Sequence, residues 1–302
     1  PEEFKNFYSE EKYKLSQNYT IDNTKFSLLT SSINLFIMIT FILIGGFNYI
    51  DIFLRDLIID SEILLGVLYF SLIILLSTIL SIPKSYYSTF YIEQKYNFNK
   101  STKMLFFTDT IKGIIITLIL GALIIYLILF IFQKYHQYAW MICWIFLSIF
   151  TVFLPIIFIN IIAPLFNKFE KLEDSDLKDK IEEYSKSVNF PLSEIFIVDG
   201  SKRSSHSNAY FTGFGKNKRI VLFDTLLNKH SDDEIISIIA HEVGHYKKNH
   251  ILINTIISII SIGLMFYILG FFINNNYLFE AFKMKNVSDY GGILFFSILY
   301  SP

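Results

Sequence analysis

Cysteine and charged residues are both scarce in this 302-residue sequence. Cys143 is the single cysteine, so the chain can form neither an internal disulfide nor a zinc or iron–sulfur site that needs several cysteines. Charged residues make up 18% of the sequence, where a soluble domain carries about a quarter, and the net charge is −1. This balance excludes a broadly basic surface, so we expect no nucleic-acid partner.

Long charge-free runs dominate the sequence instead. Crossing a hydrocarbon core about 30 Å thick takes roughly 20 apolar residues. The runs predict five complete spans and the start of a sixth, at residues 27–50, 61–82, 112–133, 137–163, 251–273 and 290–302. Pro155 and Pro164 should kink or end the fourth span. We therefore expect an all-α, multi-span bundle in the lipid bilayer, and we interpret the chain as a piece of a longer one, because the sixth run is cut off at Pro302.

A polar domain, residues 164–250, separates the fourth and fifth spans. Because each span carries the chain across the membrane, the polar domain lies on the same side as an N-terminal segment, residues 1–26, and a loop, residues 83–112. That side holds 22 of the lysines and arginines, and the other side holds four. Without the long domain the count is still nine against four. Because basic residues are retained on the inner side, we predict that the polar domain is cytosolic.

The motif His-Glu-Val-Gly-His, residues 241–245, lies within this domain. Ser231 to Glu234 has the form of a capping box ahead of apolar residues, so we expect a helix over residues 232–249. A spacing of four places His241 and His245 on one helix face, where both imidazoles can bind one zinc ion. Glu242 is then the expected general base of peptide hydrolysis. The alternative is a chance pattern in which both histidines are surface or structural groups.

A zinc site of this type needs a third protein ligand. His250 is one residue out of phase with the known three-histidine pattern, which would need histidine where Ile251 stands. We interpret His250 as a polar residue at the membrane entry of the next helix. Glu280 and Asp289 follow the fifth span and belong to the opposite side of the bilayer. The topology therefore predicts a third ligand beyond Pro302.

Short β-type segments precede the motif. Residues 195–198 predict a strand, and residues 208–212 with 219–223 predict a hairpin. Zinc peptidases commonly hold substrate as an added strand at a sheet edge, which this hairpin could supply. The residues alone favour a structural hairpin that covers the metal helix. With the motif helix, these strands indicate a small α+β, zincin-like domain.

These segments resemble a known family, the integral-membrane CAAX prenyl proteases of type I. The similarity is concentrated in GSKRSSHSNAYFTG (residues 200–213), KRIVLFDTL (218–226) and HEVGH (241–245), and it extends to residues 85–100, 167–169, 172–174 and 300–302. The resemblance implies seven helices around a chamber. The site residues that it implies are His241 and His245 as zinc ligands, Glu242 as general base, and Asn208, Ala209 and Tyr210 in the strand beside the substrate.

The same resemblance implies a zinc metalloendopeptidase that removes the last three residues of prenylated CAAX proteins and, for some substrates, makes a second cut nearer the N-terminus. It implies residence in the endoplasmic reticulum membrane and the inner nuclear membrane. The family's third ligand, a glutamate, would lie beyond Pro302, and its first span would precede Pro1. Asn97 stands where relatives usually have glycine. Asparagine is tolerable there if the backbone is left-handed, since it accepts that region better than most residues.

Two other functions stay open at this point. One is a membrane quality-control zinc protease that cuts unfolded or unprenylated proteins. The other is a multi-span transporter or scaffold whose zinc domain is inert. Cleavage of farnesylated and unprenylated versions of one peptide would separate the two proteases, and peptide hydrolysis by a zinc-loaded protein would exclude the transporter.

Overall fold

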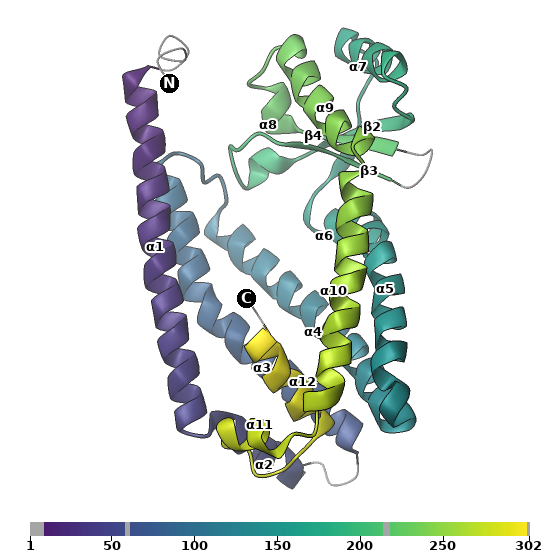
Figure 1. Ribbon diagram of the computed structural model, residues 1–302. Helices are drawn as coiled ribbons and strands as arrows, with labels where there is room; N and C mark the ends of the chain where they lie inside the picture. Colours follow the sequence, from purple (N-terminus) through teal and green to yellow (C-terminus); the bar gives the residue numbers. More distant parts are fainter. Residues whose placement is uncertain (1–8, 58–60, 214–217, 301–302) are drawn as a thin grey trace. The chain divides into compact units, whose positions relative to one another are not determined.

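The computed structural model describes residues 9–57, 61–213 and 218–300 (Figure 1). The chain divides into two compact units. The first comprises Pro1–Tyr96, Thr110–Trp144 and Gly263–Pro302, and the second comprises Asn97–Asp109 and Ile145–Ile262. Three helices, α4, α5 and α10, have residues in both units.

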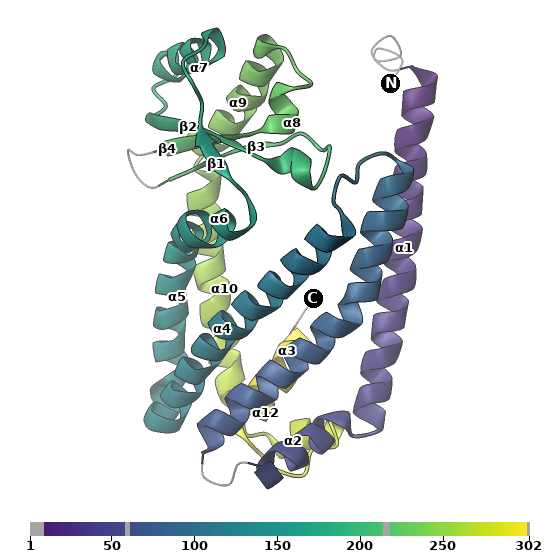
Figure 2. The same cartoon turned by 180° about the vertical axis from the view of Figure 1, so that it is seen from behind.

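The described part of the first unit is helical. Its elements are α1 (Glu10–Leu43), α2 (Gly46–Leu57), α3 (Glu62–Tyr87) with a π-helical turn (Ser88–Glu93), most of α4 (Lys103–Tyr135), the start of α5 (Ala139–Ile157), the end of α10 (His250–Phe272), α11 (Asn276–Ala281) and α12 (Asp289–Tyr300). Figures 1 and 2 show α1 and α3 side by side. Lys95 Nζ lies 2.6 Å from the Asp22 carboxylate of α1, and Tyr19 donates a hydrogen bond to Glu93.

Four helical stretches among the described residues are long and apolar enough to cross a membrane: Glu10–Leu43, Glu62–Glu93, Lys103–Phe166 and His250–Phe272. The third stretch is not one continuous helix, because a 3₁₀ turn at His136–Tyr138 separates α4 from α5. α12 is a shorter apolar helix. Pro155 lies inside α5, and a π-helical turn (Phe158–Ile162) and α6 (Ala163–Phe166) follow it.

The helix boundaries differ from those of the expected spans. The helix of the first span begins among polar residues at Glu10 and ends at Leu43, not at residue 50. Gly45 then adopts φ 73°, which glycine tolerates at little cost, and the chain continues as the separate helix α2. The expected loop at residues 83–112 is mostly helical, since α3 and its π turn reach Glu93 and α4 begins at Lys103. Absence of charge identifies apolar segments but does not locate turns within them.

A four-stranded sheet forms the centre of the second unit. Its order is β1 (Phe169–Lys171), β2 (Leu192–Val198), β4 (Lys218–Phe223), β3 (Ala209–Thr212). β2 and β4 are parallel, while β1 and β3 pair antiparallel with β2 and β4. The predicted strand at residues 195–198 and the predicted hairpin are therefore present. β3 is an edge strand of this sheet.

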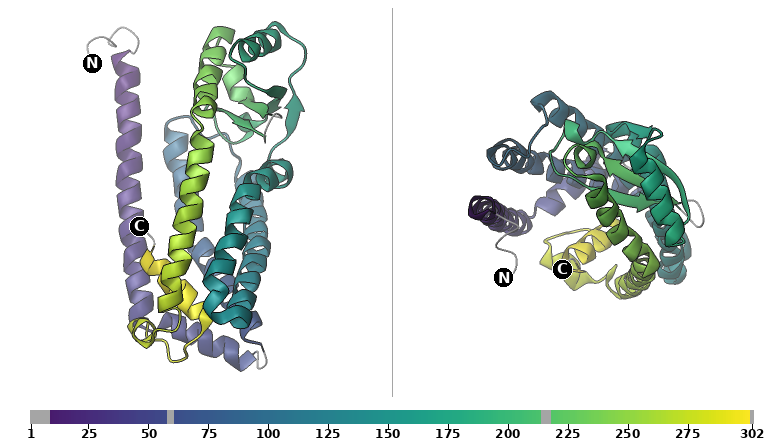
Figure 3. Two further views of the ribbon diagram at one scale, coloured as in Figure 1. Left: turned by 45° about the vertical axis from the view of Figure 1, so that its right-hand side comes forward. Right: turned by 90° about the horizontal axis from the view of Figure 1, so that it is seen from above.

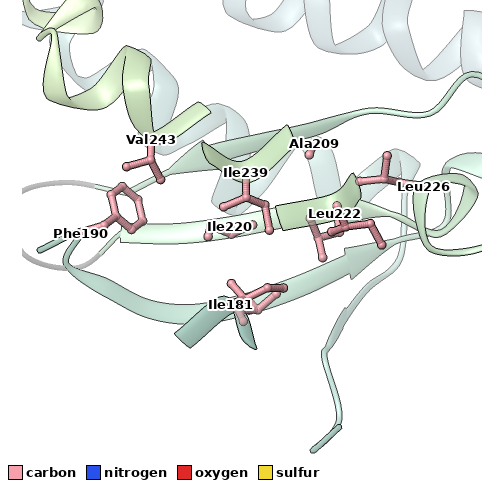
Figure 4. Packing of buried hydrophobic residues seen from close by; sticks show 10 residues of the cluster. Ile181, Phe190, Ala209, Ile220, Leu222, Leu226, Ile239 and Val243 are labelled. Atoms are coloured by element: carbon pink, nitrogen blue, oxygen red, sulfur yellow. The ribbon is translucent and has the colours of Figure 1, made fainter. Parts of the chain in front are cut away.

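Helices α7 (Asp176–Ser187) and α9 (Asp232–Lys247) pack with the sheet, and the short α8 (Asp224–Leu227) follows β4. The buried core comprises Ile181, Phe190, Ile195, Ala209, Ile220, Leu222, Leu226, Ile235, Ile239 and Val243. Figure 4 shows side chains of α9 directed toward the strands, and Figure 3 shows this helix beside the sheet from two further directions. Because burying one such side chain contributes about 1.5–3 kcal/mol, this core fixes α9 against the sheet.

Candidate active site

Helix α9 carries the histidine motif, and its start is defined by a capping box. The Glu234 carboxylate accepts hydrogen bonds from the backbone N–H of Ser231 at 2.8 Å and from the Ser231 hydroxyl at 3.1 Å. These bonds favour the ionised carboxylate and lower the pKa of Glu234. The helix ends at Lys247, two residues before the expected end, because Asn249 takes a left-handed φ of 54°.

The two faces of α9 are chemically different. Ile235, Ile239 and Val243 recur every four residues and are 1–2% exposed against the sheet. At 3.6 residues per turn, positions 241 and 245 lie about 200° away from positions 239 and 243. His241 is accordingly exposed and His245 partly exposed. The apolar periodicity that anchors the helix therefore directs the imidazoles away from the core.

The two imidazoles converge through the same ring nitrogen. His241 Nε2 and His245 Nε2 are 3.1 Å apart, and the ring planes make an angle of 75°. Two nitrogens bound to one tetrahedral zinc at about 2.0–2.1 Å lie about 3.3 Å apart. The pair therefore fits a single metal ion with little adjustment. Glu242 lies between them in sequence and is partly exposed.

A complete metal cluster is not formed within residues 9–57, 61–213 and 218–300, because no group of three or more His, Cys, Asp or Glu side chains there converges on one point. His250 approaches the pair, but through the far nitrogen of His245: the two Nδ1 atoms are 2.8 Å apart. The prediction of a third ligand beyond Pro302 stays a prediction. Sequence reasoning had placed His250 merely at the membrane entry and missed this contact.

The segment Asn208, Ala209, Tyr210 lies where the hairpin was expected. Ala209 and Tyr210 belong to β3, paired with Leu222 and Val221 of β4, and Asn208 O accepts a hydrogen bond from Phe223 N at 3.0 Å. β3 contacts α9, so the edge strand lies next to the motif helix. Tyr210 is partly buried, and desolvation raises the pKa of its phenol.

Lys218, at the start of β4, adds a cation near the same hairpin. Its ammonium lies 5.7 Å from the Phe211 ring centroid and 5.3 Å from that of Tyr246, and it donates a hydrogen bond to Gly213 O at 2.7 Å. Desolvation by burial lowers the pKa of Lys218. The lysine thereby bridges the edge strand and the last turn of α9.

Arg203 is a structural residue that sequence reasoning missed. Its guanidinium binds both oxygens of Asp109, at 2.7 and 3.1 Å, and donates to Phe166 O at 2.7 Å and to Asn167 Oδ1. A planar guanidinium that donates to several acceptors at once is typical of an arginine that holds separate chain segments together. The segment 200–213 contains two basic residues, Lys202 and Arg203, and nothing local distinguishes the arginine, whose partners are distant in sequence.

The loop that holds Arg203 is also paired through its backbone. Lys100 N donates to Arg203 O at 3.0 Å, Ser205 N donates to Phe98 O at 2.9 Å, and the His206 ring stacks on Phe98. Asn97, which opens this segment, has φ 60°. The left-handed backbone that makes asparagine tolerable at this position is therefore present. These contacts fix the approach of the chain to β3.

The apolar helices and the paired imidazoles with an intervening glutamate define a class, the membrane-embedded metallopeptidases. Comparison with known proteins identifies the family within this class. The family model described as "CAAX prenyl protease N-terminal, five membrane helices" matches residues 1–168, and that of "Peptidase family M48" matches residues 171–301. The chain belongs to the M48 metallopeptidase family, among the CAAX prenyl proteases. The expected resemblance and the expected fold class are both confirmed.

Individual relatives agree with this assignment. The chain is 37% identical to "CAAX prenyl protease 1 homolog" of Oryza sativa subsp. japonica, over 97% of this chain and 71% of that protein. It is 39% identical to "CAAX prenyl protease 1" of Saccharomyces cerevisiae, over 90% of this chain and 62% of that protein. The crystal structure of S. mikatae Ste24p matches with a TM-score of 0.91 and 37% identity, covering 100% of this chain and 74% of that one.

Proposed function

We propose that this protein is a zinc metalloendopeptidase that removes the last three residues of prenylated CAAX proteins and can make a second cut nearer the N-terminus. The observation that carries the chemistry is the 3.1 Å approach of His241 Nε2 and His245 Nε2 on α9. The substrate class rests on relatives at 37–39% identity, which are named as CAAX prenyl proteases. The comparisons favour this function over a quality-control protease or an inert scaffold.

His241 and His245 are the residues of this chain that would hold the metal. The third ligand is expected beyond Pro302. When bound, zinc would supply Lewis acidity toward the attacking water and the scissile carbonyl. Glu242 would take a proton from that water as its oxygen attacks the carbonyl carbon, and would deliver the proton to the amine as the C–N bond breaks. Hydrolysis then consumes one water and leaves a new carboxylate and a free amine.

The edge strand β3 would hold the substrate backbone. An extended peptide added beside Ala209 and Tyr210 would gain main-chain hydrogen bonds without requiring a particular sequence. β3 contacts α9, which places this edge beside the motif helix. Asn208 begins the strand, and its Oδ1 accepts a hydrogen bond from Ala209 N at 2.9 Å. Affinity for diverse CAAX sequences would follow from this mode of binding.

The expected cellular setting follows from the membrane helices and the charge distribution. Twenty-two of the basic residues were assigned to the side of the membrane that carries the motif, and basic residues favour the cytosolic side. We therefore place the metal site on the cytosolic side of the membrane. The resemblance to the CAAX prenyl proteases implies that this membrane is that of the endoplasmic reticulum or the inner nuclear membrane.

The test compares one CAAX peptide in farnesylated and unprenylated form, with full-length protein in bilayers. Burying the farnesyl chain is worth about 0.8 kcal/mol per CH₂ group, so kcat/KM should be well over tenfold higher for the farnesylated peptide. His241→Ala should abolish both stoichiometric zinc and cleavage. Equal cleavage of both peptides would support the quality-control protease, and bound zinc without any cleavage would support the inert scaffold.

A further inference from the structure

His250 is held beside the motif helix by a sharp turn between α9 and α10. Lys248 N donates to Gly244 O at 3.1 Å and Asn249 N donates to Tyr246 O at 2.9 Å, which ends α9. Asn249 has φ 54°, a left-handed conformation that asparagine adopts more readily than most residues. Helix α10 starts at His250, and Ile253 N donates to Asn249 O at 2.9 Å. The turn therefore directs His250 back toward the preceding helix.

The contact between His250 and His245 has a defined chemistry. Their Nδ1 atoms are 2.8 Å apart, their ring centroids are 4.9 Å apart, and the ring planes make an angle of 68°. At this distance one nitrogen donates a proton and the other accepts it. Each neutral imidazole has one N–H and one lone pair, so the contact couples the tautomers of the two rings.

The role of His245 Nε2 decides which of the two Nδ1 atoms carries the shared proton. His245 Nε2 converges with His241 Nε2 and must present a lone pair to bind a metal ion. The proton of His245 is then on Nδ1, which donates to the Nδ1 lone pair of His250. His250 carries its own proton on Nε2. Metal-binding histidines almost always donate their second N–H to such an outer partner, which fixes the ring and raises its basicity.

We propose that His250 is a positioning residue that fixes the tautomer and ring orientation of His245, and that it is not the third metal ligand. This inference rests on the proposed metal role of His241 and His245. It explains why His250 is out of phase with a three-histidine ligand pattern. The residue contacts the side of the His245 ring that faces away from the His241 nitrogen.

The test measures the zinc dissociation constant of full-length protein by competition with a fluorescent chelator. His250→Leu and His250→Asn form a matched pair of similar shape, and only asparagine places an acceptor oxygen where Nδ1 lies. We expect His250→Leu to weaken zinc binding about tenfold to a hundredfold, and His250→Asn to restore most of it. Lys248→Ala, an exposed change two residues away, should bind zinc like the wild type.

The outcomes separate the inference from the proposed function. Equal zinc affinity in the wild type and His250→Leu, or equal losses in the Leu and Asn variants, would overturn the positioning role. If the wild type itself bound no zinc, the proposed function would fail first. The thermal midpoint of each metal-free variant is the folding control, and it should be the same for the Leu and Asn proteins.

Discussion

Helices α9 and α10 follow one another along the chain, yet they bury their apolar residues in opposite ways. In α9, Ile235, Ile239 and Val243 are 1–2% exposed and form one stripe against the sheet. In α10, Ile257 and Ile260 are 55% and 62% exposed, and apolar residues surround the helix. For a helix in a folded domain, hydrophobic periodicity identifies the buried face. For a helix with lipid as its solvent, periodicity carries no such information.

The largest expected effect concerns the polar face of α9. Glu242→Gln should lower kcat about 10²- to 10⁴-fold on a farnesylated CAAX peptide, because the amide cannot accept the proton of the attacking water. Zinc content and the thermal midpoint should stay unchanged, since the expected ligands and the core are untouched. Parallel steady-state kinetics and metal analysis check this. Retention of full activity by the glutamine variant would refute the general-base role.

Two isoleucine truncations test the comparison itself. Ile239→Ala should destabilise the sheet domain by about 2–5 kcal/mol, since it leaves a cavity between α9 and the strands. Ile257→Ala, in the exposed part of α10, should change stability by no more than about 0.5 kcal/mol. Thermal unfolding in the same detergent measures both. Similar losses at the two sites would contradict the assignment of α10 to a lipid-facing surface.

A smaller effect is expected where the sheet domain meets the ends of apolar helices. Arg203→Lys keeps the positive charge. A lysine ammonium cannot, however, make both hydrogen bonds to the Asp109 carboxylate and also the hydrogen bond to Phe166 O. We expect a stability loss of about 1–3 kcal/mol, from acceptors left without their donors. Lys202→Ala, an exposed neighbour, is the control and should be near neutral. A double-mutant cycle with Asp109→Asn would show whether the pair is coupled.

The smallest effect belongs to the cap of α9. Glu234 has a lowered pKa, so its contribution to stability is present above its ordinary value of 4.5 and is lost as the pH falls through the folded-state value. Glu234→Gln keeps a hydrogen-bond acceptor but removes the charge. The difference in thermal midpoint between the two proteins should therefore be small near neutral pH and vanish in acid. If the difference in thermal midpoint instead grew as the pH fell, the charged form of Glu234 would not be the stabilising one.

The sequence was informative for two features that depend on residues close together along the chain. The capping box at Ser231 and Glu234 and the hairpin of β3 and β4 were both predicted and are both present. Each depends on residues a few positions apart. The break between α1 and α2 was missed, because Gly45 lies within an unbroken apolar run.

The site was predicted in part for the same reason. The spacing of four within one helix was enough to place the His241 and His245 rings together, as their 3.1 Å nitrogen separation shows. Their metal role and that of Glu242 stay predictions, as does the third ligand. Arg203 and Asp109 are 94 residues apart in sequence, and no local pattern could have paired them.

By itself, the sequence determined which segments are apolar, which helix carries the motif and which of its faces meets the sheet. These properties follow from helical periodicity and from the cost of burying charge. Only the tertiary structure decided that His250 contacts His245 and that Arg203 holds the loop before β3. A left-handed turn at Asn249 and hydrogen bonds between distant segments create those contacts, and both depend on the folded path of the chain.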